Sequence, residues 1–242
     1  KFILPLLIIF FWFIFTYTGK VPPTSLPSLS AVKDTFIEML KSGQLSNDLS
    51  LSLRRVLAGF FISSVLGISL GIFMGISSKA KEFFQLTLTA IRQIPMIAWI
   101  PLIILWAGIG EVSKIVVILF AATFPIVVNT MGGVDSTSET YLEVAKMYGL
   151  SKKDTFFKVY LPSALPNIFT GLRLGLGASW MAVVASELIA SSSGIGYRLN
   201  DARSLMRSDV VIVCMIIIGL VGLLMDKLIV LISHELTPWK KN

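Results

Sequence analysis

Apolar runs that are long enough to cross a lipid bilayer recur along this chain, and they constrain its fold more than any other feature. A bilayer core of about 30 Å is crossed by about 20 helical residues. The run from Val210 to Ile232 has that length, and its charged residues, Asp226 and Lys227, lie toward one end. Hydrophobic residues make up 55% of the 242 residues, which is more than a soluble domain needs for its core. We therefore predict an all-α polytopic membrane protein.

Six transmembrane helices are expected, with both chain ends in the cytoplasm. They comprise residues 2–18, 54–76, 94–110, 112–130, 168–190 and 210–232. The first run could instead be a signal sequence, but it lacks an Ala-x-Ala-type cleavage site and leads directly into more apolar sequence. Because the chain does not begin with Met, we expect a few residues before Lys1.

This pattern divides the chain into three regions. Residues 1–19 form the first transmembrane helix, and residues 20–53 form an extracytoplasmic linker. Apolar residues at helical spacing over 31–41 predict an amphipathic surface helix in that linker, although a solvated linker is the alternative. Residues 54–242 form the core transmembrane domain, with a cytoplasmic loop at 135–167.

Small residues recur every four positions in two of the expected spans. The second span carries such a ladder at Gly59, Ser63, Gly67, Gly71 and Gly75. The fifth span carries one small-residue face at Gly171, Gly175 and Ser179, and another at Ala178, Ala182, Ser186 and Ala190. Small residues on one helix face let two helices approach closely, which favours helix association in lipid. We expect these faces to pack on neighbouring helices and place the fifth span at the centre of the bundle.

The charged cytoplasmic loop has its own helix signals. Ser138 or Thr140 can cap a short helix that runs to Tyr148, with Glu143 in its first turn. Gly149 then stands where a helix end favours the left-handed conformation. A structured, charged loop in a membrane protein predicts a contact surface for a partner.

A second helix is expected in the same loop. Ser151 can begin it, with Asp154 three residues later as a partner of the capping-box type. Leu-Pro pairs follow at 161–162 and 165–166. Because the residue before a proline disfavours the α conformation, these pairs are expected to end the second helix before the fifth span.

The spacing in this loop resembles the EAA loop of binding-protein-dependent ABC importer permeases, E-A-A-x-x-x-G-(x)9-I-x-L-P. The residues that match it in type or register are Glu143, Ala145, Gly149, Val159, Leu161 and Pro162. Val144 and Val159 replace Ala and Ile conservatively. Residues 50–60, 93–101 and 194–203 are similar to the nitrate/sulfonate/taurine branch of the same family. The alternative for the loop is an ordinary amphipathic cytosolic segment.

The resemblance implies the type I ABC importer permease fold for residues 54–242 and a location in a prokaryotic plasma membrane. It also implies that the loop is a coupling helix that docks on a separate ATPase. The residues expected to couple are Glu143, Val144, Ala145, Lys146, Met147, Tyr148, Gly149, Leu150 and Pro162. Implied partners are two ATPase subunits, which would hold ATP and Mg, a substrate-binding protein, a second copy of this chain in a homodimer, and membrane lipid. The implied solute is a small anion such as an alkanesulfonate, taurine or nitrate.

Candidate pathway residues are polar, aromatic or helix-breaking residues in or beside the spans. They are Gln93, Pro95, Trp99, Asn129, Ser179 and Glu187. Pro95 and Pro101 predict a kinked or interrupted third span, and freed backbone groups are tolerated where they line a polar cavity. Trp99 has core or interfacial packing as its alternative role. The polar segment after Gly194 is an outer surface loop or, by the resemblance, the face on which the binding protein docks.

Other function classes fit the sequence less well. One Cys and one His leave no cysteine or histidine metal cluster within the chain, and no catalytic constellation or bound cofactor is expected. The chain contains no G-x-x-x-x-G-K-[ST] phosphate loop, so any ATP hydrolysis is expected on a partner. A standalone carrier or channel remains the alternative, although the spans are nearly free of charge at mid-depth. The net charge of +7 suits an anionic membrane surface rather than nucleic acid.

Overall fold

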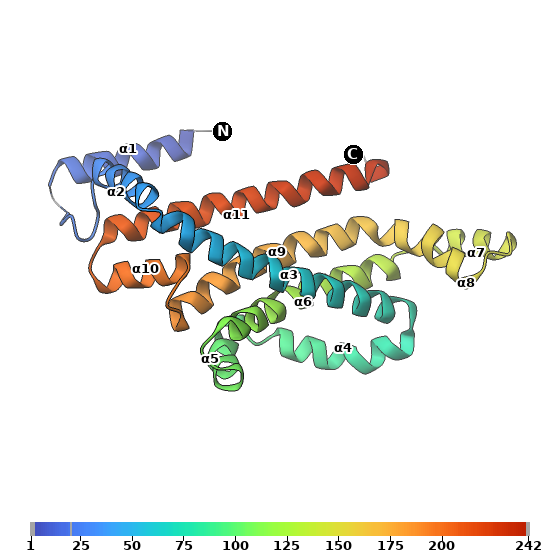
Figure 1. The fold of residues 1–242 in the computed structure, drawn as a ribbon. Helices are drawn as coiled ribbons and strands as arrows, with labels where there is room; N and C mark the ends of the chain where they lie inside the picture. The colour runs from blue at the N-terminus through green and yellow to red at the C-terminus, as the bar shows by residue number, and fades with distance from the viewer. Residues whose placement is uncertain (1–2, 20, 241–242) are drawn as a thin grey trace. The chain divides into compact units, whose positions relative to one another are not determined.

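The computed structural model describes residues 3–19 and 21–240, and that part of the chain is helical and contains no strand (Figure 1). The α-helices are α1 (Ile3–Tyr17), α2 (Leu29–Lys41), α3 (Gln44–Ile76), α4 (Ser78–Arg92), α5 (Met96–Ala107), α6 (Glu111–Asp135), α7 (Glu139–Met147), α8 (Lys152–Thr155), α9 (Leu161–Ala190), α10 (Ile195–Ser204) and α11 (Ser208–Leu236). A π-helical turn, η1 (Phe156–Tyr160), joins α8 to α9, and a 3₁₀ turn, η2 (Pro238–Lys240), follows α11. The all-α prediction is confirmed.

Four helical segments are long and apolar enough to cross a membrane. They are α3, α6, α11 and the continuous segment from Lys152 to Ala190 that contains α8, η1 and α9. The pair α4 and α5, which is bent by 98° at the break between them, would make a fifth span. Residues 6–17 of α1 form a shorter apolar helix. The multi-pass prediction is confirmed, and the count of six spans stays a prediction.

One expected helix start differs from the structure, and one further helix was not expected. The helix of the second span begins at Gln44 rather than Arg54. Gly43 precedes it with φ +73°, a left-handed conformation that ends α2 and lets the next helix start at once. The segment before the third span forms the 15-residue helix α4, in which the Ser77 hydroxyl accepts a hydrogen bond from the Ala80 amide.

The expectation that Pro162 and Pro166 end a helix is wrong. The Leu161 N–H donates to the Phe156 carbonyl five residues back, so the chain makes a wider π turn immediately before Pro162. Pro162 follows that turn inside the continuous helical segment from Lys152 to Ala190, so the helix accommodates the missing N–H of Pro162 without ending. Pro166 lies inside α9. Proline inside an apolar helix is tolerated where neighbouring groups satisfy the freed backbone.

The described residues form two compact units that do not follow chain order. One unit comprises residues 1–54 and 184–221, and the other comprises residues 55–183 and 222–242. Helices α3, α9 and α11 contribute residues to both units. The three-region division drawn from the sequence stays a prediction, and the two units are described separately below.

In the second unit, the glycine ladder of α3 lies against α6. A Cβ atom added at Gly59 would lie 2.6 Å from Ile118, and one added at Gly67 would lie 2.7 Å from Ile126. At Gly71 the added atom would lie 2.6 Å from Thr130. Real Cβ atoms essentially never make such short contacts. The two helices therefore pack at a distance that only small residues allow.

Helix α9 approaches another side of α6 in the same way. An added Cβ at Gly175 would lie 2.8 Å from Ile126, and one at Gly171 would lie 3.0 Å from Asn129. A Cβ atom added at Gly133 of α6 would lie 2.8 Å from Asn167 of α9. Ile126 is fully buried between the two glycine faces. Within this unit α6 is the helix that glycine faces of both α3 and α9 contact.

Candidate functional site

The charged loop forms a short helix, α7, that follows Ser138, one of the two expected cap residues. Ser138 occupies the N-cap position, but its hydroxyl makes no capping hydrogen bond. The helix begins at Glu139, so this residue lies in the first turn, where the helix dipole favours an anion. Glu143, which was expected there, lies in the second turn and is exposed.

The end of α7 is a Schellman motif, as expected for a helix that stops at glycine. Gly149 has φ +66°. Its N–H donates to the Lys146 carbonyl at 3.0 Å, and the Leu150 N–H donates to the Ala145 carbonyl at 3.0 Å. The expected left-handed conformation of Gly149 is confirmed. The chain reverses there and leads into α8.

Ser151 and Asp154 begin the next helix as the sequence predicts. The Ser151 hydroxyl accepts a hydrogen bond from the Asp154 amide at 3.1 Å and donates one to the Asp154 carboxylate at 2.6 Å. Lys158 forms an ion pair with the same carboxylate at 3.0 Å. The three side chains fix the start of the segment that continues through η1 into α9.

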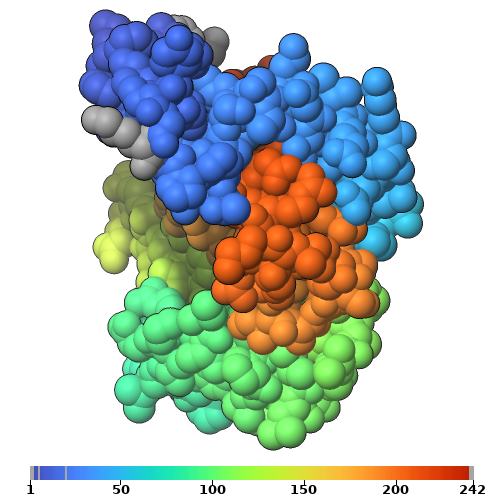
Figure 2. All heavy atoms as spheres, turned by 90° about the vertical axis from the view of Figure 1, so that its left-hand side faces the viewer, coloured from blue at the N-terminus to red at the C-terminus, as the bar shows by residue number. Residues whose placement is uncertain are grey.

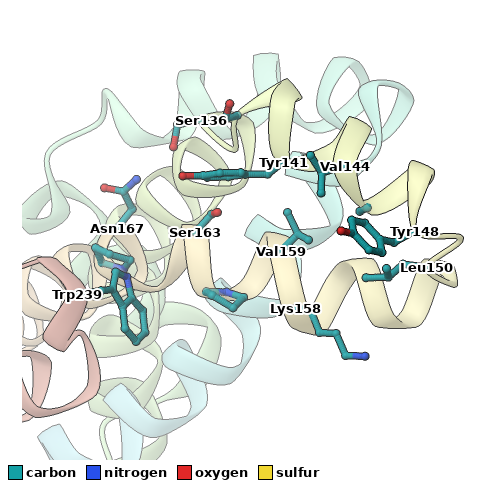
Figure 3. A pocket seen from close by; sticks show the side chains of 14 residues that line it. Ser136, Tyr141, Val144, Tyr148, Leu150, Lys158, Val159, Ser163, Asn167 and Trp239 are labelled. Carbon is teal, nitrogen blue, oxygen red and sulfur yellow. The ribbon is translucent and has the colours of Figure 1, made fainter.

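A groove of about 790 Å³ lies between α7 on one side and η1 with the start of α9 on the other (Figure 3). We call it the loop groove. Five of the expected coupling residues line it, namely Val144, Ala145, Tyr148, Leu150 and Pro162. The other four, Glu143, Lys146, Met147 and Gly149, are exposed outside it. Other residues that line it are Ser136, Ser138, Tyr141, Lys158, Val159, Ser163, Pro166, Asn167 and Trp239.

Aromatic side chains dominate the exposed surface of this site. Tyr148 is 81% exposed at the end of α7, and the neighbouring Met147 is 85% exposed. Tyr141 lies two helical turns before Tyr148 and borders the same groove (Figure 3). Trp239 of η2 borders the end of the groove near Asn167 (Figure 3). Large exposed apolar groups of this kind are typical of a protein interface.

The sequence analysis missed Tyr141 and Trp239 as members of this site. Tyr141 shares its helix face with Val144, Ala145 and Tyr148 because residues three, four and seven apart face the same way. That spacing is visible in the sequence. Trp239 lies outside the loop, and no local pattern connects it to α7.

Two candidate pathway residues of the second unit form side-chain hydrogen bonds within their own helices. The Asn129 amide donates to the Pro125 carbonyl at 2.8 Å, and the buried Ser179 hydroxyl donates to the Gly175 carbonyl at 2.9 Å. The Trp99 ring centroid lies 5.5 Å from that of Phe120. Gln93 ends α4, and Pro95 stands directly before α5. Their role in a pathway stays a prediction.

Glu187, the remaining pathway candidate, holds a backbone loop in the first unit. The amides of Gly194, Ile195 and Gly196 donate to three separate side chains. The Gly194 amide donates to a carboxylate oxygen of Asp48 at 3.1 Å, and the Ile195 amide donates to the hydroxyl of Ser52 at 3.0 Å. The Gly196 amide donates to a carboxylate oxygen of Glu187 at 3.0 Å. The Ser52 hydroxyl also lies 2.8 Å from the other Glu187 oxygen. We call these groups the α10 anchor because they hold the start of α10.

The α10 anchor is buried and closely packed. Asp48, Ser52 and Glu187 are 6%, 0% and 1% exposed. An added Cβ at Gly194 would lie 2.4 Å from the Glu187 carboxylate, so only glycine fits there. Arg198, on the first turn of α10, donates to Asp48 at 2.9 Å. Carboxylates that accept backbone amides in a buried site form strong hydrogen bonds.

A second polar contact in the same unit lies after the end of α10, at the first turn of α11. The Arg207 guanidinium forms an ion pair with Asp209 at 2.7 Å, and the Thr35 hydroxyl donates to the same carboxylate at 2.7 Å. Hydrogen bonding to Asp209 raises the pKa of Arg207. Between these two contacts, α10 forms part of the surface in Figure 2, where it is coloured orange.

Comparisons with known proteins identify the family of this chain. A family model described as "binding-protein-dependent transport system inner membrane component" matches residues 63–237. A protein of Bacillus subtilis described as an aliphatic sulfonate transport permease is 37% identical over 99% of this chain and 87% of its own length. The taurine transport system permease protein of Escherichia coli is 35% identical over 79% of this chain and 70% of its own length.

The fold also matches that of solved transporter structures. A chain from the crystal structure of an amino acid ABC transporter superposes with a TM-score of 0.68 at 16% identity, over 83% of this chain and 98% of that one. The structure is therefore the permease fold of type I ABC importers. With the family match over most of its length, the chain belongs to the inner membrane components of binding-protein-dependent transport systems.

Proposed function

We propose that this chain, together with a second permease subunit, forms the pathway through which an ATP-driven importer moves a small anion into the cell. The chain is the permease component, and its family works with a substrate-binding protein and an ATPase. The finer proposal is that the ATPase docks at the loop groove. The observation that carries it is the exposed aromatic and apolar surface of α7 beside that groove.

The exposed side chains suit a docking surface. Tyr148 and Met147 are large side chains at the end of α7 that the Schellman motif fixes. Tyr148 has only two rotatable side-chain bonds, so it loses little conformational freedom when a partner covers it. The Schellman motif at Gly149 determines the direction in which α7 ends. ATP and Mg are assigned to the ATPase, which supplies hydrolysis.

Movement of α7 would be transmitted through packed contacts of the second unit. Ala145 is 4% exposed, so α7 is held against the rest of its unit. The segment from Lys152 to Ala190 is one continuous helical body, which joins the loop directly to α9. Asn167 and Gly171 of α9 meet α6 at Gly133 and Asn129. Because close-packed helices transmit displacement, tilting of α7 would shift α9 and α6 and so switch the pathway between its two openings.

The proposed solute is a sulfonate or another small anion. The named relatives support the sulfonate class, since one is described as an aliphatic sulfonate permease and the other as a taurine permease. The sequence resemblance extends the class to nitrate. Two permease copies, two ATPase subunits and delivery by a binding protein complete the proposed assembly.

The test is purification of the tagged chain in mild detergent from its native membrane, followed by mass identification of partners and an ATPase assay of the eluate. The combined variant Glu143→Lys, Gly149→Val reverses a charge and strains the end of α7. Glu38→Lys of α2 is the matched control, because Glu38 is also exposed on a helix. We expect an ATPase with the wild-type chain and with the control, and none with the combined variant.

A chain that brings down no ATPase under conditions that preserve other membrane complexes would contradict the docking proposal. A standalone carrier would then be the better description. Equal amounts of ATPase with the wild type and the combined variant would place the docking surface outside the loop.

A further inference from the structure

A bidentate ion pair joins two apolar helices within the second unit. The Arg173 Nε atom of α9 donates to Asp226 Oδ1 of α11 at 2.5 Å, and Arg173 Nη2 donates to Oδ2 at 2.8 Å. The side chains are 51% and 43% exposed. Charged groups within membrane helices are costly in lipid and almost always face the protein interior or water. The exposed part of this pair therefore points to a polar function rather than to a lipid contact.

A cavity of about 160 Å³ adjoins the pair and is rich in hydrogen-bonding groups. Thr170, Arg173, Ser233 and His234 contribute its polar lining, and apolar residues of the same two helices complete it. None of the described residues that line it is acidic. The lining therefore favours an acceptor-rich, negatively charged ligand.

The Arg173 guanidinium is oriented and still has unused donors. A guanidinium carries five N–H groups, and the pair with Asp226 uses two of them. Asp226 thus fixes the plane of the group without exhausting it. The Thr170 hydroxyl donates to the Pro166 carbonyl at 3.0 Å, so its proton is already used. The Ser233 hydroxyl and the His234 imidazole border the same space.

We propose that this cavity is a binding site for one small oxyanion group, a sulfonate or a phosphate. Arg173 holds two of its oxygens, Asp226 orients Arg173, and Ser233 donates to the third oxygen. The group can come from an imported sulfonate or from the phosphate of an anionic lipid headgroup. The sulfonate source rests on the proposed function, whereas the lipid source does not.

The test measures thermal unfolding of the full chain, with its ATPase where the two purify together, in maltoside micelles that carry no phosphate. The intrinsic tryptophan fluorescence reports unfolding. Ethanesulfonate is added in one series and phosphatidylglycerol in the other, with sodium chloride at equal ionic strength as the salt control. We expect one of the two probes to raise the unfolding temperature of the wild type in a saturable manner.

The decisive variant is Arg173→Gln with Asp226→Asn, which replaces the ion pair by a neutral hydrogen-bonded pair of similar shape. We expect the probe concentration at half effect to rise by about tenfold or more, because charge-assisted bonds to the anion are lost. The matched control is Lys81→Gln with Asp135→Asn, which neutralises another interhelical ion pair of the second unit, outside this cavity. That control is expected to respond like the wild type.

Ser233→Ala keeps the Arg173–Asp226 ion pair, so it provides a second test if the decisive variant fails to fold. It is expected to raise the concentration at half effect severalfold, in keeping with the loss of about one hydrogen bond. A response to ethanesulfonate that depends on Arg173 or Ser233 assigns the site to the solute. A response to phosphatidylglycerol alone with the same dependence assigns it to a lipid headgroup.

The proposal is overturned if neither probe shifts the wild type, or if the shift is unchanged in both the decisive variant and Ser233→Ala. Uptake of labelled ethanesulfonate into proteoliposomes is measured separately. If the complete wild-type importer takes up none while the Arg173-dependent shift persists, the proposed solute class fails and the oxyanion site stands.

Discussion

At the scale of single residues, the α10 anchor shows how a carboxylate in an apolar helix can serve structure. Glu187 accepts a hydrogen bond from the Gly196 amide and lies within hydrogen-bond distance of the Ser52 hydroxyl. All three residues are buried. An unpaired buried polar group costs about 1–3 kcal/mol. The anchor therefore connects the start of α10 to α9 through bonds that cannot be lost without penalty.

Glu187→Gln tests this connection. Glutamine has nearly the same shape as glutamate, but its NH₂ group is a donor in place of one acceptor oxygen. In the wild type both carboxylate oxygens lie close to the Ser52 hydroxyl, and one of them accepts a hydrogen bond from the Gly196 amide. We expect the free energy of unfolding to fall by about 1–3 kcal/mol and hydrogen exchange of the 194–196 amides to accelerate. The exposed Glu38→Gln change is the control and should alter neither. Unchanged exchange at 194–196 would mean that Glu187 does not hold the loop.

Sequence reasoning selected Glu187 as a candidate pathway residue and did not predict its hydrogen-bond partners. A carboxylate inside an apolar span suggested a pathway, because such residues are often functional. Ser52 and Asp48 are 135 and 146 residues from their partners in the chain, so no local spacing connects them. The only local sequence feature of this site was the pair of glycines, Gly194 and Gly196. The structure explains why they are glycines, because an added Cβ at either position would lie too close to Glu187.

At the scale of helices, the contact between α3 and α6 depends on the absence of side chains. An added Cβ at Gly71 would lie 2.8 Å from the Val127 carbonyl oxygen as well as close to Thr130. A rotamer change can move a side chain, but a carbonyl moves only with its helix. The repeat of four residues predicted this face because it depends on helix geometry alone.

Gly71→Ala is therefore expected to destabilise the protein even though alanine is the better helix former. Overpacking of this kind costs about 1–3 kcal/mol. Gly177→Ala on α9 is the matched control, since no atom lies within 4 Å of an added Cβ there, and it should be neutral or stabilising by up to about 1 kcal/mol. The measurement is the unfolding temperature of each purified variant. Equal shifts in the two variants would argue against close packing at Gly71.

Helix boundaries were less predictable than helix faces. The prolines after η1 suggested a helix end, yet one π turn absorbs the missing N–H of Pro162 and the helix continues. The π turn lies in the five residues before Leu161, and the proline pattern did not predict it. The bend of 98° between α4 and α5, in contrast, lies at Gln93 to Pro95, where Pro95 predicted an interruption. Pro101 lies inside α5 and does not end it.

At the scale of the whole molecule, the proposed function requires that a movement of α7 in the loop be transmitted to the membrane helices. The family, the fold and the permease role followed from apolar spans and a short motif, because both are local in the sequence. The loop groove was only half predictable, since Trp239 enters it from the other end of the second unit's sequence. The solute is not encoded by any local pattern, and the proposed oxyanion cavity combines residues of α9 and α11.

Gly149→Val separates the cost to folding from the cost to transport. A β-branched residue at φ +66° is strained by about 1–3 kcal/mol, so the end of α7 should shift or fray. Gly43→Val is the matched control, because Gly43 has φ +73° at the end of α2 and, like Gly149, meets no atom within 4 Å of an added Cβ. Both variants should lose similar stability in thermal unfolding. Only Gly149→Val should lose most solute uptake in proteoliposomes, because it alone alters the surface on which the ATPase is proposed to dock. Full uptake by Gly149→Val, with normal ATPase binding, would contradict a mechanical role for this helix end, and an equal loss in both variants would attribute the defect to stability alone.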